Sequence, residues 1–140
     1  MLVYLDTNIV VYLVEQPPEW GALTARRLRE LADGGHRFAV SHLVRMECRV
    51  RPLRLHEEEV LAAYDAYFVS GDLAILELGA AVFDRAADLR AVHGLRALDA
   101  LHLAAALEGL CDAFLTNDEH LRAFPALEVI PLPTASDGPP

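Results

Sequence analysis

Short apolar runs alternate with longer stretches of helical periodicity along this chain. The first run, residues 2–5 (LVYL), stops at an acidic residue and is typical of a buried strand. The apolar positions after it recur at helical spacing until Pro17 and Pro18, which cannot continue a helix. The same patterns predict further strands at 37–40, 73–76, 113–116 and 127–130. They predict helices at 19–32, 42–50, 56–68 and 78–92 and a further helix that has Asp99 in its first turn. Residues 118–123 are expected to form a short helical turn.

The order of these elements predicts the fold class. Strands that are separated by helices, without tight hairpin signals between them, pair in parallel through right-handed crossovers. We therefore expect one three-layer α/β/α domain over residues 1–132, with a central parallel sheet of about five strands. Residues 133–140 (PTASDGPP) lack apolar content and are expected to form a flexible tail.

The composition agrees with one well-filled core. Hydrophobic residues make up 54% of the 140 residues, and every apolar run is shorter than the roughly 20 residues that cross a bilayer. We expect no membrane contact, and the first residues do not resemble a secretion signal. Cys48 and Cys111 do not form a C-x-x-C pair, so a cytoplasmic protein with reduced thiols is expected.

Four acidic residues lie where the predicted elements bring them to one edge of the sheet. Asp6 directly follows the first strand, and Asp118 follows the fourth after two polar residues. Glu47 lies about two turns into the helix after the second strand, and Asp99 lies in the first turn of its helix. Ligands of parallel α/β sheets bind at the carboxyl ends of the strands. Singly, Asp6 and Asp118 are explained by capping and Asp99 by the helix dipole. The largely apolar neighbours of Glu47 suggest partial burial instead, and together the four acids indicate a site.

A cluster of carboxylates predicts a divalent cation. The mutual repulsion of the acids is costly unless a cation balances it, and ligands that are all oxygen favour Mg²⁺ or Mn²⁺ over zinc. The formal charge of −9 argues against a nucleic-acid partner, which usually needs a basic surface. Two bound divalent cations would weaken this objection, because they offset about four of the negative charges.

Four sequence blocks together resemble a PIN domain. They are YLDTNIVVYL around Asp6, SHLVRMECRVRP around Glu47, LRALDALHLAAA around Asp99 and FLTNDEHLRAF around Asp118. In this order the match runs from the first predicted strand to the last and leaves out only the tail. A single-domain PIN protein of this length resembles the VapC toxin of a toxin–antitoxin pair.

The resemblance implies both an activity and partners. The activity is that of a Mg²⁺- or Mn²⁺-dependent endoribonuclease, which hydrolyses RNA with a metal-activated water. The partners are a VapB-like antitoxin that blocks the site and a second copy in a homodimer. The metal-binding acids of the family match Asp6, Glu47, Asp99 and Asp118. The adjacent polar positions, which orient carboxylates or waters, match Thr7, Asn8, Thr116 and Asn117.

Two histidines qualify this resemblance. His120 stands where some PIN sequences have a further carboxylate, so one of two metal sites is expected to be the weaker. His102 lies three residues after Asp99 and therefore on the same helical face. We interpret His102 as a hydrogen-bonded packing histidine rather than as a contact to substrate or water.

Four arginines around Glu47 form a candidate contact surface for RNA or for the antitoxin. All twelve basic residues of the chain are arginine, so the residue type alone does not indicate phosphate binding. A solvated helix face explains the cluster equally well. The cluster consists of Arg45, Arg49, Arg51 and Arg54.

Two other functions stay open. A haloacid-dehalogenase-type phosphatase also begins with a strand and an aspartate, but its general acid would stand at Asn8, and an amide cannot supply the proton. The other alternative is a PIN-like interaction module without activity, although all four carboxylates are present. An RNA cleavage assay with and without EDTA separates these alternatives from a metal-dependent nuclease.

Overall fold

Strand β1 (Leu2–Leu5) lies at the centre of a five-stranded parallel sheet. The structure is a computed structural model that describes residues 1–121 and 127–132. The strand order is β3-β2-β1-β4-β5, and every neighbouring pair is parallel. The other strands are β2 (Arg37–Ser41), β3 (Leu73–Leu76), β4 (Ala113–Thr116) and β5 (Glu128–Pro131).

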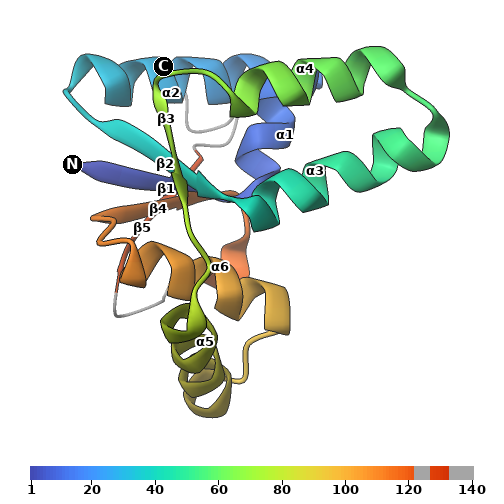
Figure 1. The fold of residues 1–140 in the computed structure, drawn as a ribbon. Coiled ribbons are helices and arrows are strands. Elements are labelled where there is room, and N and C mark those ends of the chain that lie inside the picture. Colours follow the sequence, from blue (N-terminus) through green and yellow to red (C-terminus); the bar gives the residue numbers. More distant parts are fainter. Residues whose placement is uncertain (122–126, 133–140) are drawn as a thin grey trace.

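Helices cover both faces of this sheet. Figure 1 shows α1 to α4 on one side of the sheet and α5 and α6 on the other. Helices α3 and α4 contact each other and extend together past the sheet. The predicted three-layer α/β/α fold is therefore confirmed. The helices are α1 (Thr7–Glu15), α2 (Gly21–Asp33), α3 (His42–Leu55), α4 (Glu58–Phe68), α5 (Ala80–His93), α6 (Ala97–Glu108) and the short 3-10 helix η1 (Glu119–Leu121).

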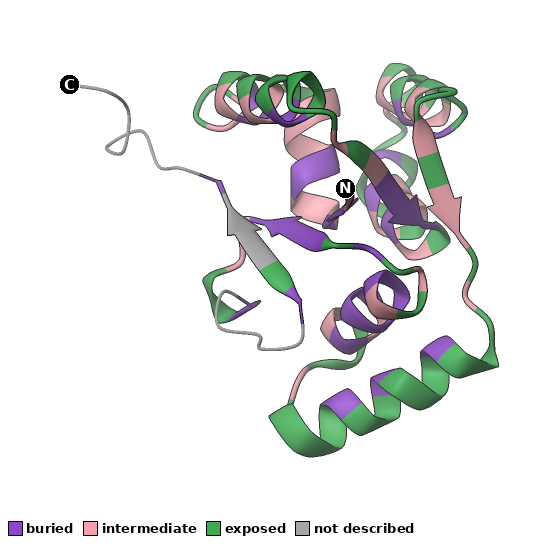
Figure 2. Ribbon diagram, turned by 90° about the vertical axis from the view of Figure 1, so that its left-hand side faces the viewer, coloured by how far each residue is buried: buried purple, intermediate pink, exposed green. Residues whose placement is uncertain are grey.

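The core lies between β1, β4 and the helices that cover them. Tyr4, Leu5 and Phe114 are fully buried, and the rings of Tyr4 and Phe114 stack with their centroids 5.3 Å apart. Small side chains such as Ala100 and Ala104 are buried on α6, which allows this helix to approach its neighbours closely. Helix α5 packs on α6 and is mostly exposed, at the bottom of Figure 2.

The direction in which strands are added to the sheet reverses at β1. Strands β2 and β3 are added on one side of β1, and the chain then crosses to form β4 and β5 on the other side. The carboxyl ends of β1 and β4 therefore form a topological switch point, where open α/β sheets bind their ligands. The N–H of Asp6 donates to the carbonyl of Leu115 at 3.0 Å, which fixes Asp6 at this point.

Helix α3 is longer than the sequence predicts. The predicted end of this helix at residue 50, before Pro52, is wrong, because α3 continues to Leu55 with Pro52 buried inside it. A proline removes a single N–H donor, and the carbonyl of Pro52 still accepts a hydrogen bond from the N–H of Glu57 at 2.9 Å. The helix ends at His56, whose left-handed φ of 56° stops the next turn.

Two expectations from composition concern the whole chain. Within residues 1–121 and 127–132, no helix has the length and apolarity that crossing a membrane requires. Cys48 and Cys111 are both buried and free, and burial raises the pKa of Cys111 to about 11. The predicted tail at 133–140 lies outside the described residues, so the boundary at 132 stays a prediction.

Candidate functional site

Asp6 is a buried carboxylate at the switch point between β1 and β4. It caps α1, because its Oδ1 accepts a hydrogen bond from the N–H of Thr7 at 2.8 Å. Its Oδ2 accepts a hydrogen bond from the hydroxyl of Thr116 at 2.7 Å. Burial raises the pKa of Asp6 above its ordinary value, although His102 and these hydrogen bonds oppose the rise. A nearby cation would therefore stabilise the ionised form of this side chain.

The polar residues next to Asp6 and Asp118 join β4 to α1. The hydroxyl of Thr116 also accepts a hydrogen bond from the N–H of Asp118 at 3.0 Å. Asn8 accepts a hydrogen bond from the N–H of Asn117 at 3.2 Å, and the Asn117 amide donates to the hydroxyl of Tyr12 at 3.1 Å. The structure thus brings the two predicted polar pairs together, and their role in orienting ligands stays a prediction.

Glu47 is held by hydrogen bonds from two elements. Its Oε1 accepts a hydrogen bond from the hydroxyl of Thr7 at 2.8 Å and contacts Nε2 of His102. An ionised carboxylate only accepts, so Nε2 donates to it, and Nδ1 of the same ring lies within hydrogen-bond distance of the Tyr4 hydroxyl, at 2.9 Å. Tyr4 contacts the hydroxyl of Ser41 at 2.8 Å. Burial raises the pKa of Glu47, but the hydrogen bonds from His102 and Thr7 outweigh burial and lower it.

The hydrogen-bonded packing role predicted for His102 is confirmed, but the sequence did not predict its partners Glu47 and Tyr4. Its side chain is buried, as a packing histidine would be, but it also links α6 to Glu47 on α3. The spacing of three residues from Asp99 was the available signal, since it places both side chains on one helical face. The second partner, Tyr4, is 98 residues away in the chain, and a local pattern cannot reveal such a contact.

Asp99 and Asp118 share a basic partner. Nε of Arg96 donates to Oδ2 of Asp99 at 3.0 Å, and Nη2 of Arg96 lies 3.7 Å from Oδ2 of Asp118. The other oxygen of Asp118 accepts a hydrogen bond from the N–H of His120 at 2.9 Å and contacts the ring Nδ1 at 3.0 Å. His120 therefore has a partner that sequence spacing did not indicate.

One continuous series of contacts connects all four predicted acids. Thr7 joins Asp6 to Glu47, Thr116 joins Asp6 to the backbone of Asp118, and Arg96 joins Asp118 to Asp99. Distant parts of the chain thus meet at the carboxyl ends of β1 and β4, as the sequence predicts.

The acids do not yet form a compact metal centre. In the parts of the chain that the structure describes, no three His, Cys, Asp or Glu side chains are grouped closely enough to hold a metal ion. Separate partners occupy the acids instead, with Thr7 and His102 on Glu47 and Arg96 on Asp99 and Asp118. The donors are nevertheless all oxygen atoms, which fits a hard cation such as Mg²⁺ or Mn²⁺.

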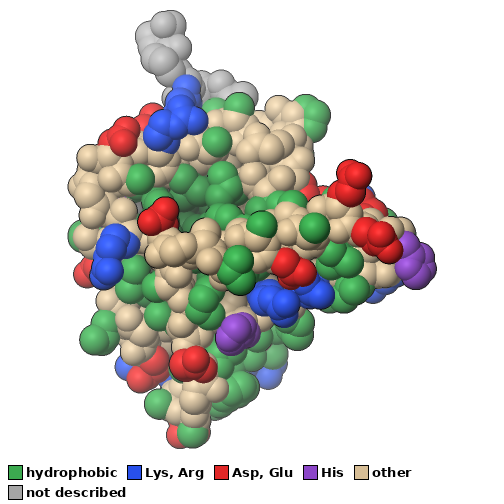
Figure 3. Space-filling model, turned by 45° about the horizontal axis from the view of Figure 1, so that its top comes forward, with side chains coloured by type: hydrophobic (Ala, Val, Ile, Leu, Met, Phe, Trp, Pro, Cys, Tyr) green, Lys and Arg blue, Asp and Glu red, His purple; other side chains and the backbone are tan. Residues whose placement is uncertain are grey.

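The arginine cluster is partly engaged in packing α3 against α4. Arg45 lies 3.4 Å from Asp65 on α4, and Arg49 contacts the same carboxylate. Arg51 and Arg54 are exposed. On the face shown in Figure 3, acidic and basic side chains lie interspersed with apolar ones. Arg51 and Arg54 thus have the greater freedom to contact a partner, and their role stays a prediction.

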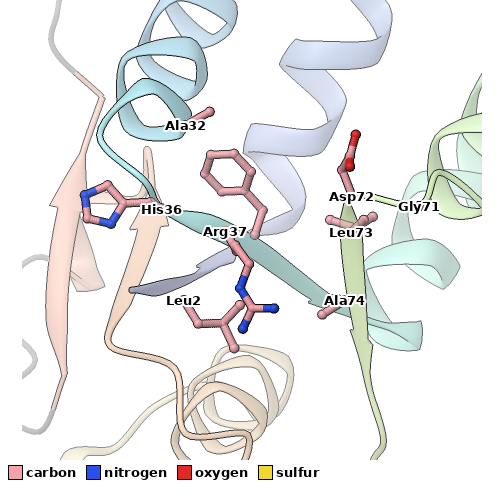
Figure 4. A pocket seen from close by; sticks show the side chains of 9 residues that line it. Leu2, Ala32, His36, Arg37, Gly71, Asp72, Leu73 and Ala74 are labelled. Carbon is pink, nitrogen blue, oxygen red and sulfur yellow. The ribbon is translucent and has the colours of Figure 1, made fainter.

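Two surface hollows lie at opposite ends of the strands. A hollow of about 510 Å³ borders Asp99, one of the four acids, and its lining also includes Arg96 and His120. A hollow of about 570 Å³ lies near the amino ends of β1, β2 and β3, between His36 and Asp72 (Figure 4). The acids lie at the carboxyl ends, so the larger hollow is separate from the candidate site.

Comparisons with known proteins agree with this fold. The profile of the PIN domain matches residues 3–127. The structure is similar to that of VapBC2 from Rickettsia felis bound to a DNA fragment from their promoter, with a TM-score of 0.76, 21% identity, and coverage of 94% of this chain and 98% of the other. DNA-bound VapBC from Salmonella typhimurium gives a TM-score of 0.74 and 18% identity, over 94% and 99% of the chains.

A third similar structure is that of a toxin that cleaves RNA. It is VapC20 from Mycobacterium tuberculosis, described as a sarcin-ricin loop cleaving toxin, with a TM-score of 0.66 and 16% identity over 89% and 90% of the chains. Sequence comparison with curated proteins gives no match. At such low identities, the structural similarity shows a shared fold.

Proposed function

Because the chain belongs to the PIN domain family, we propose that it is a cytoplasmic Mg²⁺- or Mn²⁺-dependent endoribonuclease and the toxin of a type II toxin–antitoxin pair. The observation that carries this proposal is the series of contacts that joins four acids from four segments at the switch point of the sheet. A purely structural role would not need four carboxylates connected at the same end of the sheet, since the repulsion of neighbouring carboxylates costs stability.

The four acids would hold the cation. They are Asp6, Glu47, Asp99 and Asp118, and their oxygen donors suit a hard divalent ion. When bound there, a divalent ion supplies an activated water for attack on phosphorus and stabilises the charge on the leaving 3′ oxygen.

The surrounding side chains orient two of these acids and favour the ionised form of Glu47. Thr7 and His102 both donate to Glu47, which lowers its pKa and fixes its rotamer. Thr116 donates to Asp6 and fixes the direction of its second oxygen. Such positioning hydrogen bonds reduce the reorganisation that ligand binding requires.

The partners are proposed from the relatives. VapBC2 of Rickettsia felis and VapBC of Salmonella typhimurium are toxin–antitoxin complexes on DNA, and a further similar structure is a toxin–antitoxin complex from Klebsiella pneumoniae. These similarities support a VapB-like antitoxin for this chain. VapC20, which cleaves the sarcin-ricin loop, supports RNA as the class of substrate. A homodimer is proposed from the family resemblance of the sequence.

A cleavage assay tests the activity. End-labelled RNA is incubated with the purified protein in Mg²⁺ or Mn²⁺, in EDTA, and in EDTA followed by excess Mn²⁺. We expect cleavage with either ion, loss of cleavage in EDTA and recovery on re-addition. The variant Asp6→Asn should lose cleavage by at least about a hundredfold, because it removes a charge from the cation site.

The matched control is Asp72→Asn, which makes the same change at an exposed aspartate at the other edge of the sheet. This control should cleave like the wild type. Metal-independent cleavage, or full activity of Asp6→Asn, would contradict the proposal. No cleavage of any RNA by a folded wild-type protein would favour the interaction module.

The phosphatase alternative loses support from the position of Asn8. Its Oδ1 accepts a hydrogen bond from the N–H of Asn117, and its Nδ2 is directed to the Thr116 hydroxyl at 3.5 Å. Both ends of this amide therefore help to join β4 to α1. The position offers no acid to protonate a leaving group.

A further inference from the structure

Arg96 lies between two of the acids proposed to hold the cation. Its Nε donates to Asp99 at 3.0 Å, and its Nη2 lies 3.7 Å from Asp118. Arg96 is the N-cap residue of α6, but its side chain forms no capping hydrogen bond there. The guanidinium is therefore engaged with the acids and is not needed to begin the helix.

These ion pairs are suited to exchange. The side chain of Arg96 is 79% exposed, whereas those of Asp99 and Asp118 are 21% and 20% exposed. Ion pairs of an exposed arginine contribute little to stability, because water screens them and the long side chain loses freedom. A divalent ion carries twice the charge and binds carboxylate oxygens directly, so it would displace the guanidinium.

The displaced side chain would remain beside the site. Arg96 borders the hollow of about 510 Å³ that Asp99 and His120 also line. The planar guanidinium matches the oxygens of a phosphate group and binds them with two hydrogen bonds. An RNA backbone that enters this hollow would therefore offer Arg96 a new anionic partner.

We propose that Arg96 is an exchangeable counter-ion, which holds Asp99 and Asp118 until a divalent cation replaces it and then binds a phosphate of the RNA. The inference rests on the function proposed above. In this arrangement Arg96 offsets the mutual repulsion of Asp99 and Asp118. It also makes cation binding and RNA binding favour each other.

Calorimetric titration of Mn²⁺ into the protein without RNA tests the first half. The variant Arg96→Gln keeps most of the side-chain length and removes the competing charge. We expect it to bind Mn²⁺ about three- to tenfold more tightly than the wild type at low salt, with a smaller difference at high salt. The control is Arg85→Gln, since Arg85 forms a similar exposed ion pair with Glu108 at 2.9 Å.

The control should bind Mn²⁺ like the wild type. Equal Mn²⁺ affinities of Arg96→Gln and the wild type, or the same gain in the control, would overturn the proposal. This measurement does not depend on cleavage. A protein that binds Mn²⁺ but cuts no RNA would contradict the proposed function and would leave the comparison of Mn²⁺ affinities valid.

RNA binding in Ca²⁺ and in EDTA tests the second half, with fluorescence anisotropy of a labelled oligonucleotide. In Ca²⁺ we expect Arg96→Gln to bind RNA about five- to tenfold more weakly than the wild type. The slope of the logarithm of its association constant against the logarithm of salt concentration should be shallower by the value of about one phosphate contact. In EDTA the two proteins should bind equally, because Arg96 is then occupied by the acids. Equal affinities in Ca²⁺, or the same weakening in both solutions, would overturn this half.

Discussion

At the scale of the residue, Asp6 combines burial with a charge. Its pKa is raised mainly by burial, so between its unfolded and folded pKa values the folded state binds a proton more readily. The contribution of Asp6 to stability therefore falls as the pH rises through this window.

The variant Asp6→Asn removes that charge and keeps the shape of the side chain. We expect it to be at least as stable as the wild type at pH 7, and to lose this relative advantage below the ordinary pKa of aspartate. Urea unfolding from pH 3 to pH 8 measures the difference. Mn²⁺ at about a hundred times its Kd should stabilise the wild type by about 2.7 kcal/mol and the variant far less. A variant that is less stable at pH 7, yet still stabilised by Mn²⁺, would contradict both expectations.

His102 should prove essential to the local structure of the site. It is 2% exposed and joins Glu47 to Tyr4, so His102→Ala removes two buried hydrogen bonds and leaves a cavity. We expect the free energy of unfolding to fall by about 2–4 kcal/mol and RNA cleavage to be lost. The control His120→Ala changes a side chain that is 92% exposed and should alter stability by less than about 0.5 kcal/mol.

The milder variant Tyr4→Phe separates positioning from packing. It removes only the hydroxyl between Ser41 and His102 and should cost about 1 kcal/mol. If cleavage by Tyr4→Phe falls while the protein stays folded, the hydrogen bonds orient Glu47. If His102→Ala is as stable and active as the wild type, the role described for His102 is wrong.

The sequence predicted the acids and their polar neighbours better than it predicted the residues that hold them. Asp6 stands directly after β1 and Asp118 two residues after the end of β4, so their place at this end of the sheet follows from the predicted strands. The spacing of His102 and Arg96 from Asp99 did not reveal their roles, because these depend on partners such as Tyr4 and Asp118. Contacts between distant segments decide these roles.

At the scale of the element, the turn between α1 and α2 depends on a glycine. A Cβ at Gly21 would lie 2.8 Å from the Cα and 2.9 Å from the carbonyl carbon of Gln16. Gln16 itself has a left-handed φ of 53° and ends α1. Both close atoms belong to the backbone, so the start of α2 would have to move away from the end of α1.

We expect Gly21→Ala to lower the free energy of unfolding by about 1–3 kcal/mol. The control is Gly71→Ala, since a Cβ at Gly71 meets no atom within 4 Å and should leave stability within about 0.5 kcal/mol of the wild type. Denaturant unfolding of the three proteins measures both values. Equal stability of Gly21→Ala and Gly71→Ala would show that the turn can relax.

The elements themselves were largely predictable. Strands β1, β3 and the first four residues of β2 coincide with the predicted ranges, because short apolar runs between turn residues leave few alternatives. The end of α3 was not predictable, since the buried position of Pro52 is decided by tertiary packing. Ser41 is the N-cap residue of α3, as a serine just before a helix suggests, but its hydroxyl contacts Tyr4 instead of capping the helix.

At the scale of the whole molecule, the sheet order explains why these acids meet. Strands β1 and β4 are neighbours in the sheet although more than a hundred residues separate them in the chain. Alternating strands and helices predict parallel pairing, but they do not predict which strand lies beside which. The site at the β1–β4 switch point is thus a property of the topology.

The net charge of −9 affects how the whole molecule interacts with RNA. A protein with this charge repels RNA unless cations or local basic groups compensate. Under the proposed function, a divalent ion at the acids would compensate, and Arg96 would then become available for phosphate. The proposal therefore places a cation at the end of the sheet where the acids lie.

The position of the cation is tested most directly by diffraction from a crystal soaked in Mn²⁺, recorded at the manganese absorption edge. We expect an anomalous peak between the carboxylates of Asp6 and Asp99, and its loss in crystals of Asp6→Asn. A map without a peak among the four acids, or with a peak only elsewhere on the protein, would contradict it.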